Sequence, residues 1–511
     1  MEQNITNNPK VTAIFNYIVK VSGIFNYQQR DTFTIKGKEN IKLFLLSATD
    51  NEAFLLTNDN SKEIQVGDEV VKTQNFFVFT NEKHFGKIIN IYGDEVYPKS
   101  QRIDYEHGNI YHPFFGLPHN LMSVRTLNEQ LYTGIILIDL LFPIGKGQRE
   151  LIIGDRQTGK THIAINTIIN QAKKNIKCVY VAIGQKKEAI TNIYNTLKKY
   201  NALDNTIIID APSTSPYEQY LAPYVGMAHA ENISETNDVL IIFDDLTKHA
   251  NIFREMALLS DKPVGKEAMP GDMFFAHSSL LERAGSFANK KTITALPILQ
   301  TIDNDITSLI ASNIISITDG QIVTSSDLFA QGKFPAINAD LSVSRTGSSV
   351  QTRAVTKVSG EIGKIYKAYK RHLKLSLLDY DFNKEISDLL YKGKMIDKLF
   401  TKNGFSLYSY SFAIFMTKII SWGILKNIKD DQKALAFLDT LIKISDDAKN
   451  AFDLIKNDEP HDEDMMKNYF AYALKQYSDF LDLKWDVNYE YGFIPLDKEI
   501  LEKIAKENGD K

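Results

Sequence analysis

The first part of the chain, from residue 11 to about residue 78, carries short runs in which apolar and polar positions alternate. Thr32-Phe33-Thr34-Ile35 is one such run, and turn clusters such as Asp50-Asn51 separate the runs from one another. Alternation with a period of two is typical of half-buried strands, and regular turns between the runs favour hairpins. The segment is therefore predicted to form a small antiparallel β-barrel or sandwich, with strands at residues 32–35, 41–46, 53–56 and 70–71.

The middle of the chain, from about residue 81 to residue 380, alternates short apolar runs with segments of helical periodicity. The runs expected as strands are residues 151–153, 178–183, 206–209, 239–243, 292–297 and 313–317. Such alternation predicts a mostly parallel sheet with helices on both faces. The ligand site of such a sheet lies at the carboxyl ends of its strands.

After about residue 381 the apolar residues recur at helical spacing, as at Phe437, Leu438, Leu441 and Ile442. This pattern predicts a helical C-terminal domain. The expected fold class is therefore multidomain α/β, in three parts. They are an N-terminal β-barrel over residues 1–78, an α/β domain over residues 79–382, and a helical domain with an extended tail over residues 383–511.

The amino-acid composition and net charge limit the kinds of molecule that this chain is expected to bind. The net charge of -4 over 511 residues supplies no positive field for a nucleic acid, and no polybasic run marks a membrane-binding surface. A single cysteine, Cys178, lies in an apolar run and excludes a disulfide within the chain. The ten histidines have no metal-ligand spacing, and the most apolar windows, residues 131–144 and 412–425, are too short and too interrupted for a bilayer span. We therefore expect no transition metal and no nucleic acid, and partners that are proteins and small molecules.

The most specific chemical signal follows the apolar run Leu151-Ile152-Ile153, where a glycine-rich segment leads into a helical pattern. Glycines let the backbone curl so that its N–H groups face a phosphate chain. Lys160 can then reach the terminal phosphates, and the Thr161 hydroxyl can ligate Mg²⁺. The segment predicts a site for ATP or ADP with Mg²⁺, built from Gly154, Asp155, Arg156, Gln157, Thr158, Gly159, Lys160 and Thr161.

A second element of the same site is expected at Asp244. The apolar run of residues 239–243 ends in Asp244 and Asp245, so a carboxylate stands at the carboxyl end of a predicted strand. An aspartate in that place holds Mg²⁺ in phosphate-loop proteins. Asp244 is therefore predicted to hold Mg²⁺ through water, together with Thr161, and Asp245 is interpreted as a helix cap.

These motifs resemble the nucleotide-binding segment of the α subunit of rotary F-type ATP synthases. The similar residues follow that family's order, and the resemblance is dense from about residue 123 to residue 360. They include Gly147-Gln148-Arg149-Glu150, Tyr180-Val181-Ala182-Ile183-Gly184-Gln185-Lys186, Pro270-Gly271-Asp272, Ile315-Ser316-Ile317-Thr318-Asp319-Gly320 and Val343-Ser344-Arg345. The resemblance implies a RecA-like P-loop NTPase core for the central domain. It also implies an α-type subunit that alternates with a catalytic β-type sister subunit in a hexamer around a central γ-type shaft.

Two residues carry the roles that the resemblance implies. Where this chain has Gln185, the catalytic sister subunits have a glutamate that polarises the attacking water, and a neutral amide cannot accept a proton. The chain is therefore expected to bind ATP without turning it over at a useful rate. Arg345 is expected to enter the neighbour's site as an arginine finger and to stabilise charge on the γ-phosphate during transfer.

Departures from the family's pattern leave parts of this interpretation open. The loop after Leu296-Pro297 and the segment around Ser260-Asp261-Lys262 differ, and the glutamines that contact adenine are not recognisable near residues 375–381. The segment from about residue 483 extends past the family's usual end, which invites contact with a peripheral stalk or a further protein. As part of such a complex, the chain is expected in the cytoplasm, at the inner face of the cell membrane and touching it only indirectly.

Three alternatives stay open. A rotary ATPase of F-type character could drive another process, such as gliding motility. A hexameric RNA translocase of the termination-factor kind has a small barrel and a similar core, but the charge of -4 and Gln185 oppose it. A catalytic β-type or secretion-type subunit would hydrolyse ATP as a homomer, and turnover by the purified chain would reveal it.

Overall fold

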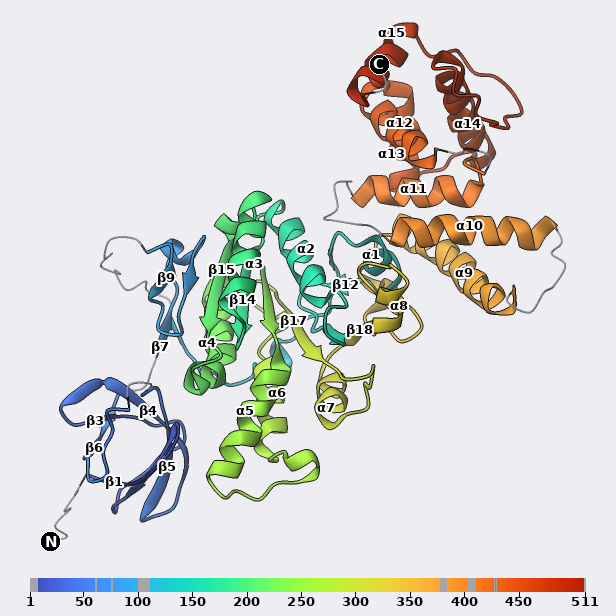
Figure 1. The fold of residues 1–511 in the computed structure, drawn as a ribbon. Coiled ribbons are helices and arrows are strands. Elements are labelled where there is room, and N and C mark those ends of the chain that lie inside the picture. The colour runs from blue at the N-terminus through green and yellow to red at the C-terminus, as the bar shows by residue number, and fades with distance from the viewer. Residues whose placement is uncertain are drawn as a thin grey trace. The chain divides into compact units, whose positions relative to one another are not determined.

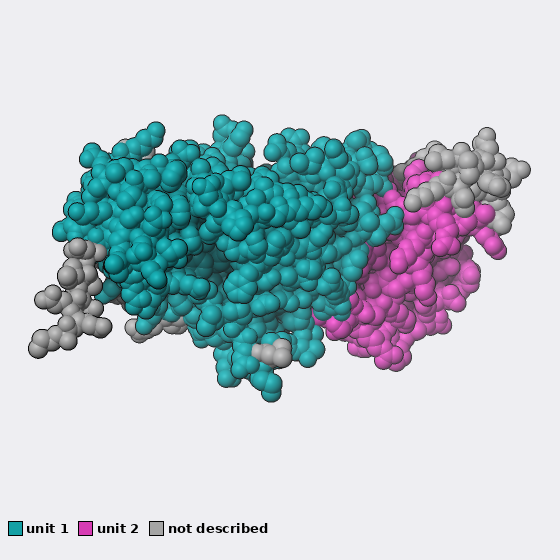
Figure 2. All heavy atoms as spheres, turned by 90° about the horizontal axis from the view of Figure 1, so that it is seen from below, with its two compact units in different colours: residues 1–133, 144–346 teal, residues 134–143, 347–511 magenta. Residues whose placement is uncertain are grey.

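A computed structural model describes residues 8–59, 62–74, 77–99, 111–376, 384–401, 410–426, 428 and 430–509. The chain divides into two compact units (Figure 2). Unit 1 comprises Met1–Thr133 and Ile144–Thr346, and unit 2 comprises Gly134–Pro143 and Gly347–Lys511. The three ranges expected from the sequence stay predictions, and the boundary expected at residue 382 lies outside the described residues.

Unit 1 begins with a six-stranded antiparallel sheet that curls into a barrel (Figure 1). The strands are β1 (Lys10–Phe15), β2 (Ile18–Ser22), β3 (Thr32–Ile35), β4 (Lys38–Ala48), β5 (Glu52–Thr57) and β6 (Val70–Thr73), in the order β1-β2-β5-β4-β3-β6. The two ends of the sheet meet where Lys10 pairs with Glu69 and the Val11 N–H donates to the Asp68 carbonyl at 2.9 Å. This closure confirms the N-terminal barrel predicted from alternation.

A nine-stranded sheet forms the centre of unit 1, in the order β19-β18-β13-β17-β16-β14-β15-β8-β9. Its strands are β8 (Ile88–Ile89), β9 (Glu95–Tyr97), β13 (Leu151–Gly154), β14 (Lys177–Ile183), β15 (Thr206–Ala211), β16 (Val239–Asp244), β17 (Ile293–Gln300), β18 (Gly320–Thr324) and β19 (Val343–Ser344). Strands β18, β13, β17, β16, β14, β15 and β8 are parallel, and only the outer strands β9 and β19 run the other way. All residues of β13 and β16 are buried, because helices cover both faces of the sheet. Five of the expected strands are present as β13 to β17.

Helices and short ribbons complete unit 1 (Figure 1). The helices are α2 (Lys160–Ala172), α3 (Lys187–Lys199), α4 (Pro216–Ser234), α5 (Leu246–Leu259), α6 (Asp272–Leu281), α7 (Leu309–Ile317) and α8 (Ser326–Ala330). Strand β7 (Phe77–Phe79) pairs with β10 (Tyr111–Pro113), and β11 (Gln130–Leu131) pairs with β12 (Ile144–Gly145). One apolar core extends from barrel residues such as Phe44 to the strands and helices of the large sheet.

Residues 313–317, expected as a strand, belong instead to helix α7, so that expectation was wrong. Within α7 the buried residues Ala311 and Ile314 are three positions apart, as on one face of a helix. The strand at this edge of the sheet is β18, which begins at Gly320. A short apolar run rich in isoleucine has no periodicity that separates a buried strand from a helix face.

Unit 2 is helical. Its helices are α1 (Ile136–Leu141), α9 (Arg353–Ser376), α10 (Lys384–Phe400), α11 (Tyr410–Trp422), α12 (Asp431–Ile444), α13 (Asp446–Asn457), α14 (Glu463–Phe480) and α15 (Lys498–Glu507). Phe437 and Leu441 of α12 are fully buried, which confirms the helical C-terminal region predicted from spacing. Within the described ranges, no helix has the length and apolar character that a bilayer span requires.

Candidate functional site

The loop between β13 and α2 makes a turn that depends on its glycines. Gly159 is the N-cap of α2 with a φ of 100°, in the left-handed region that favours glycine. A Cβ at Gly154 would collide with Thr324 of β18, so the backbones of the two strands approach closely there. Gly159 provides no side-chain cap for α2. The first N–H groups of a helix lack partners within the helix and can bind an anion.

Lys160 is folded over the same loop. Its Nζ donates to the Gly154 carbonyl at 2.7 Å and to the Asp155 carbonyl. Burial lowers the pKa of Lys160, and the nearby carboxylates of Asp245 and Asp244 oppose that shift. Lys160 thus lies where a phosphate chain following the loop would meet its ammonium group.

Three donors converge on the carboxylate of Asp244, the last residue of β16. The Thr161 hydroxyl donates to Oδ2 at 3.2 Å, the Tyr180 hydroxyl donates to the same oxygen, and Gln185 Nε2 donates to Oδ1 at 3.0 Å. The structure therefore brings the predicted residues Thr161, Gln185 and Asp244 together. Tyr180 was not expected here, although a fully buried tyrosine hydroxyl in a strand normally signals a polar partner.

The Thr161 hydroxyl and the Asp244 carboxylate fit a magnesium ion. Mg²⁺ takes oxygen ligands and is usually held by one or two protein groups, with water and phosphate oxygens completing its shell. No group of three or more histidine, cysteine, aspartate or glutamate side chains that could hold a metal was found in the part of the chain that the structure describes. The donor set at Asp244 therefore suits an ion that binds together with phosphates.

The segment after β17 and a hydrogen bond within the loop itself hold the phosphate loop in place. Asp155 Oδ1 accepts from the Thr301 hydroxyl at 2.6 Å and from the Asn304 N–H at 3.0 Å. The Thr158 hydroxyl donates to the Asp155 carbonyl at 2.8 Å. Arg156 and Gln157 lie exposed at the tip of the loop. Thr301 and Asn304 were not expected at this site, because they come from the segment after β17.

Asp245 caps α5, in agreement with its interpretation from the sequence. Its Oδ1 accepts from the Lys248 N–H at 2.9 Å. Burial, with the neighbouring carboxylate of Asp244, raises the pKa of Asp245 to about 6. The second carboxylate of the pair is thus fixed by the helix and does not join the Asp244 cluster.

Arg345 lies apart from the other predicted site residues. It follows β19, whose Ser344 pairs with Gly320 at the start of β18. The other end of β18, at Thr324, lies beside the phosphate loop, where its hydroxyl and that of Thr158 are 2.7 Å apart. The two ends of β18 are four residue steps apart, about 13 Å at the usual rise per residue.

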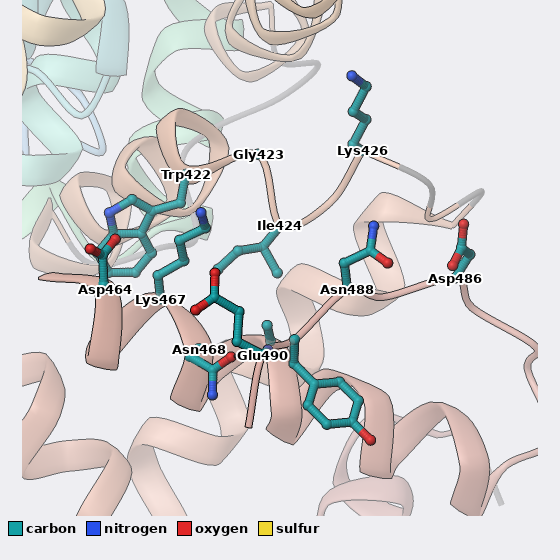
Figure 3. A pocket seen from close by; sticks show the side chains of 12 residues that line it. Trp422, Gly423, Ile424, Lys426, Asp464, Lys467, Asn468, Asp486, Asn488 and Glu490 are labelled. Atoms are coloured by element: carbon teal, nitrogen blue, oxygen red, sulfur yellow. Dashed lines mark hydrogen bonds between the residues drawn. The ribbon is translucent and has the colours of Figure 1, made fainter. Parts of the chain in front are cut away.

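A hollow of about 260 Å³ lies in unit 2, beside the end of α11 (Figure 3). Its lining mixes cations with carboxylates, among them Lys426, Lys467 and Glu490. Lys426 is paired with Asp388 at 2.7 Å. Trp485, in the C-terminal segment that the sequence analysis noted, is buried. Asn468, another lining residue, accepts from the Glu490 N–H, so the polar groups of this hollow already bond to one another.

Comparisons with known proteins agree with these features. The sequence profile of the ATP synthase alpha/beta family, nucleotide-binding domain, matches residues 134–344. ATP synthase subunit alpha 2 of Mycoplasmopsis pulmonis is 42% identical over 97% of this chain and 97% of that protein. ATP synthase subunit alpha 1 of the same organism is 38% identical over 88% of this chain and 85% of that protein. ATP synthase subunit alpha of Petrotoga mobilis is 36% identical over 88% of this chain and 92% of that protein.

Proposed function

The chain belongs to the family of ATP synthase alpha subunits, and from that premise we propose that it is the non-catalytic subunit of a rotary F-type ATPase. In this proposal it alternates with a catalytic β-type subunit in a hexamer around a γ-type shaft. It binds ATP or ADP with Mg²⁺ and lends Arg345 to the adjacent catalytic site. The complex would lie in the cytoplasm, at the inner face of the cell membrane.

The nucleotide would be held by the loop and the cluster around Asp244. The N–H groups at the start of α2 and the Lys160 ammonium would bind the phosphates. Thr161 and Asp244, whose side-chain oxygens are 3.2 Å apart, would hold Mg²⁺. Bound Mg²⁺ would neutralise phosphate charge in this site.

The hydrogen bonds of Gln185 support the proposal that this chain does not hydrolyse ATP. Its Nε2 donates to the Asp244 carboxylate at 3.0 Å and to the Asp244 carbonyl at 3.2 Å. The amide therefore holds the Mg²⁺ ligand in place, and it has no basic group with which to accept a proton from water. A site built in this way retains a nucleotide but lacks the general base that hydrolysis needs.

The observation that carries the proposal is the position of Arg345. The side chain is exposed, and the length of β18 separates it from the phosphate loop of its own chain. An arginine finger provided to a neighbouring subunit contributes about 10³ to 10⁵ in rate in other nucleotide hydrolases. An exposed arginine that cannot act on its own chain's nucleotide is suited to that role.

The proposal is tested by Arg345→Ala in a complex reconstituted from this chain and the catalytic subunit that copurifies with it. ATP hydrolysis by the complex should fall by about 10³-fold or more, while ATP retention by this chain stays unchanged. Arg353→Ala, which removes an arginine that is 92% exposed, is the matched control and should leave the rate unchanged. An undiminished rate for Arg345→Ala, or brisk hydrolysis by the isolated chain, would contradict the proposal.

A second candidate function is an F-type ATPase that drives a process other than ion flow, such as gliding motility. The observation in its favour is that identity and coverage are higher with subunit alpha 2 of M. pulmonis than with subunit alpha 1. An organism with two alpha subunits can assign one of them to a second machine. Isolation of the native complex, followed by identification of every copurifying protein, distinguishes the two functions.

A further inference from the structure

We propose that Asp319, anchored by Arg149, is a positioning residue that sets the geometry of Arg345. The inference rests on the proposed function, in which Arg345 acts in the site of a neighbouring subunit. Neither Arg149 nor Asp319 would touch the reacting phosphate. Their effect would pass through the backbone segment on which Arg345 lies.

Arg149 and Asp319 are joined through both their side chains and their backbones. The Arg149 backbone N–H and Nε both donate to Asp319 Oδ2, at 2.9 and 3.0 Å, and NH2 donates to Oδ1 at 2.8 Å. In return the Asp319 N–H donates to the Arg149 carbonyl at 2.7 Å. A bidentate guanidinium-carboxylate pair of this kind fixes direction as well as distance. Four hydrogen bonds thus tie residue 319 to residue 149, two positions before β13.

The segment that ends at Asp319 also contacts Arg345. The Arg345 N–H donates to the Asp319 carbonyl at 2.9 Å. Its guanidinium donates to the carbonyls of Thr318 and Ile315, at 3.0 and 3.3 Å. These carbonyls lie at the C-terminal end of α7, where the helix dipole favours a cation. Both the backbone and the side chain of Arg345 are therefore supported by residues 315–319.

Other contacts around Arg345 do not depend on the Arg149–Asp319 pair. Packing of α7 through Ala311 and Ile314, and the pairing of Gly320 with Ser344, do not involve the Arg149 or Asp319 side chains. The fold around Arg345 would therefore persist, but its support would be looser. A displacement of about 1 Å in a catalytic group can lower a rate by about 10²-fold. The expected defect is thus in kcat, with little change in KM.

The test uses the reconstituted complex and four forms of this chain: wild type, Asp319→Ala, Arg345→Ala and the double variant. Asp319→Ala should lower kcat by about tenfold to 10²-fold, with KM and ATP retention by this chain unchanged. In the Arg345→Ala background the same change should cause no further loss, because Asp319 would act only through Arg345. An equal loss in both backgrounds, or no loss in either, would overturn the inference.

Two further variants keep the test decisive. Arg149→Lys retains the charge but loses the bidentate geometry, and it should reproduce most of the kcat defect if Asp319→Ala does not fold. Asp238→Ala is the matched control, because Asp238 is a partly exposed carboxylate that pairs with Lys146 at 3.2 Å and accepts from Thr292. It should leave kcat unchanged. An undiminished rate for Arg345→Ala would overturn the proposed function and this inference together. A defect in Arg345→Ala without one in Asp319→Ala or Arg149→Lys would overturn the inference alone.

Discussion

The Lys160 ammonium group lies on the phosphate loop, where it could pair with the negative charge of a bound phosphate. This ammonium donates to two carbonyls of the loop, those of Gly154 and Asp155. A phosphate oxygen carries a full charge and would be a stronger acceptor than either carbonyl. A phosphate chain that follows the loop would therefore compete with these carbonyls for the ammonium group.

Lys160→Ala should consequently weaken ATP retention by the isolated chain by about 10²-fold, the equivalent of losing charge-assisted bonds of about 1.5–3 kcal/mol each. Equilibrium dialysis with labelled ATP measures this loss. Lys173→Ala, at the opposite end of α2, is the control and should retain wild-type affinity. Unchanged retention in Lys160→Ala would show that the loop does not bind the phosphates.

The sequence predicted part of the candidate site because strand ends and a glycine-rich loop are local signals. Thr161, Gln185 and Asp244 each follow or end an apolar run, and they meet because β13, β14 and β16 end at the same edge of the sheet. Tyr180 could not be predicted in the same way. Its contact with Asp244 depends on β14 lying next to β16, and strand order is not written in the sequence of either strand.

At the scale of elements, the pairing of α9 with α10 depends on one glycine. A Cβ at Gly393 would collide with the side chain of Tyr369, so the two helices approach closely at this point. Gly360 lies on α9 as well, but a Cβ there would meet no atom within 4 Å. A substitution to alanine therefore adds a methyl group in a crowded place at Gly393 and in open space at Gly360.

Gly393→Ala should destabilise the protein by about 1–3 kcal/mol, because the added methyl group overpacks the contact with Tyr369. Gly360→Ala should stabilise it by about 0.5–1 kcal/mol, because alanine loses less backbone entropy in a helix. Urea unfolding of both variants, followed by circular dichroism, measures the two free energies. Equal effects would mean that the close approach of α9 and α10 does not exist in solution.

Strands and helices could be predicted where the spacing of apolar residues had a clear period, and could not where that spacing fitted both. The alternation in residues 32–35 predicted β3 with the bounds that the structure has. Residues 313–317 were wrongly expected as a strand, because three isoleucines in five residues fit either a buried strand or a helix face. The short strands β8 and β9 have too few residues to show any period, so their place at the end of the sheet, after β15, was not expected.

The interior of unit 1 holds two pairs of histidines. His84 and His229 lie edge to face with ring centroids 5.6 Å apart, and His249 Nδ1 lies 3.1 Å from His277 Nε2. All four side chains are buried. Burial lowers the pKa of His84 and of His249 to about 4 and that of His229 to about 3. The folded chain therefore keeps these rings neutral at a pH where an unfolded chain would protonate them.

The sign of the pH effect follows from that difference. A histidine with a lowered pKa in the folded state contributes stability that is fully present above its unfolded pKa of about 6.5 and is lost as the pH falls. Asp245 acts in the opposite direction, because its pKa is raised to about 6 and the folded state binds its proton more tightly. The change of stability with pH is therefore the sum of opposite contributions from the histidines and from Asp245. The contribution of a single histidine must be obtained by comparing the wild type with a variant that lacks it.

The substitution His229→Gln isolates the contribution of one buried histidine to the pH dependence of stability. His229 is about 1% exposed, and its Nδ1 lies 2.8 Å from the Thr80 hydroxyl, so it is held in the core as a neutral ring. Between about pH 6.5 and pH 5, the free energy of unfolding of the variant should fall less steeply than that of the wild type. The difference should approach about 1.4 kcal/mol per pH unit, the value for one proton. Urea unfolding at several pH values measures both slopes, and Asp245 cancels because it is present in both proteins. Parallel slopes would mean that burial does not keep His229 neutral in the folded protein.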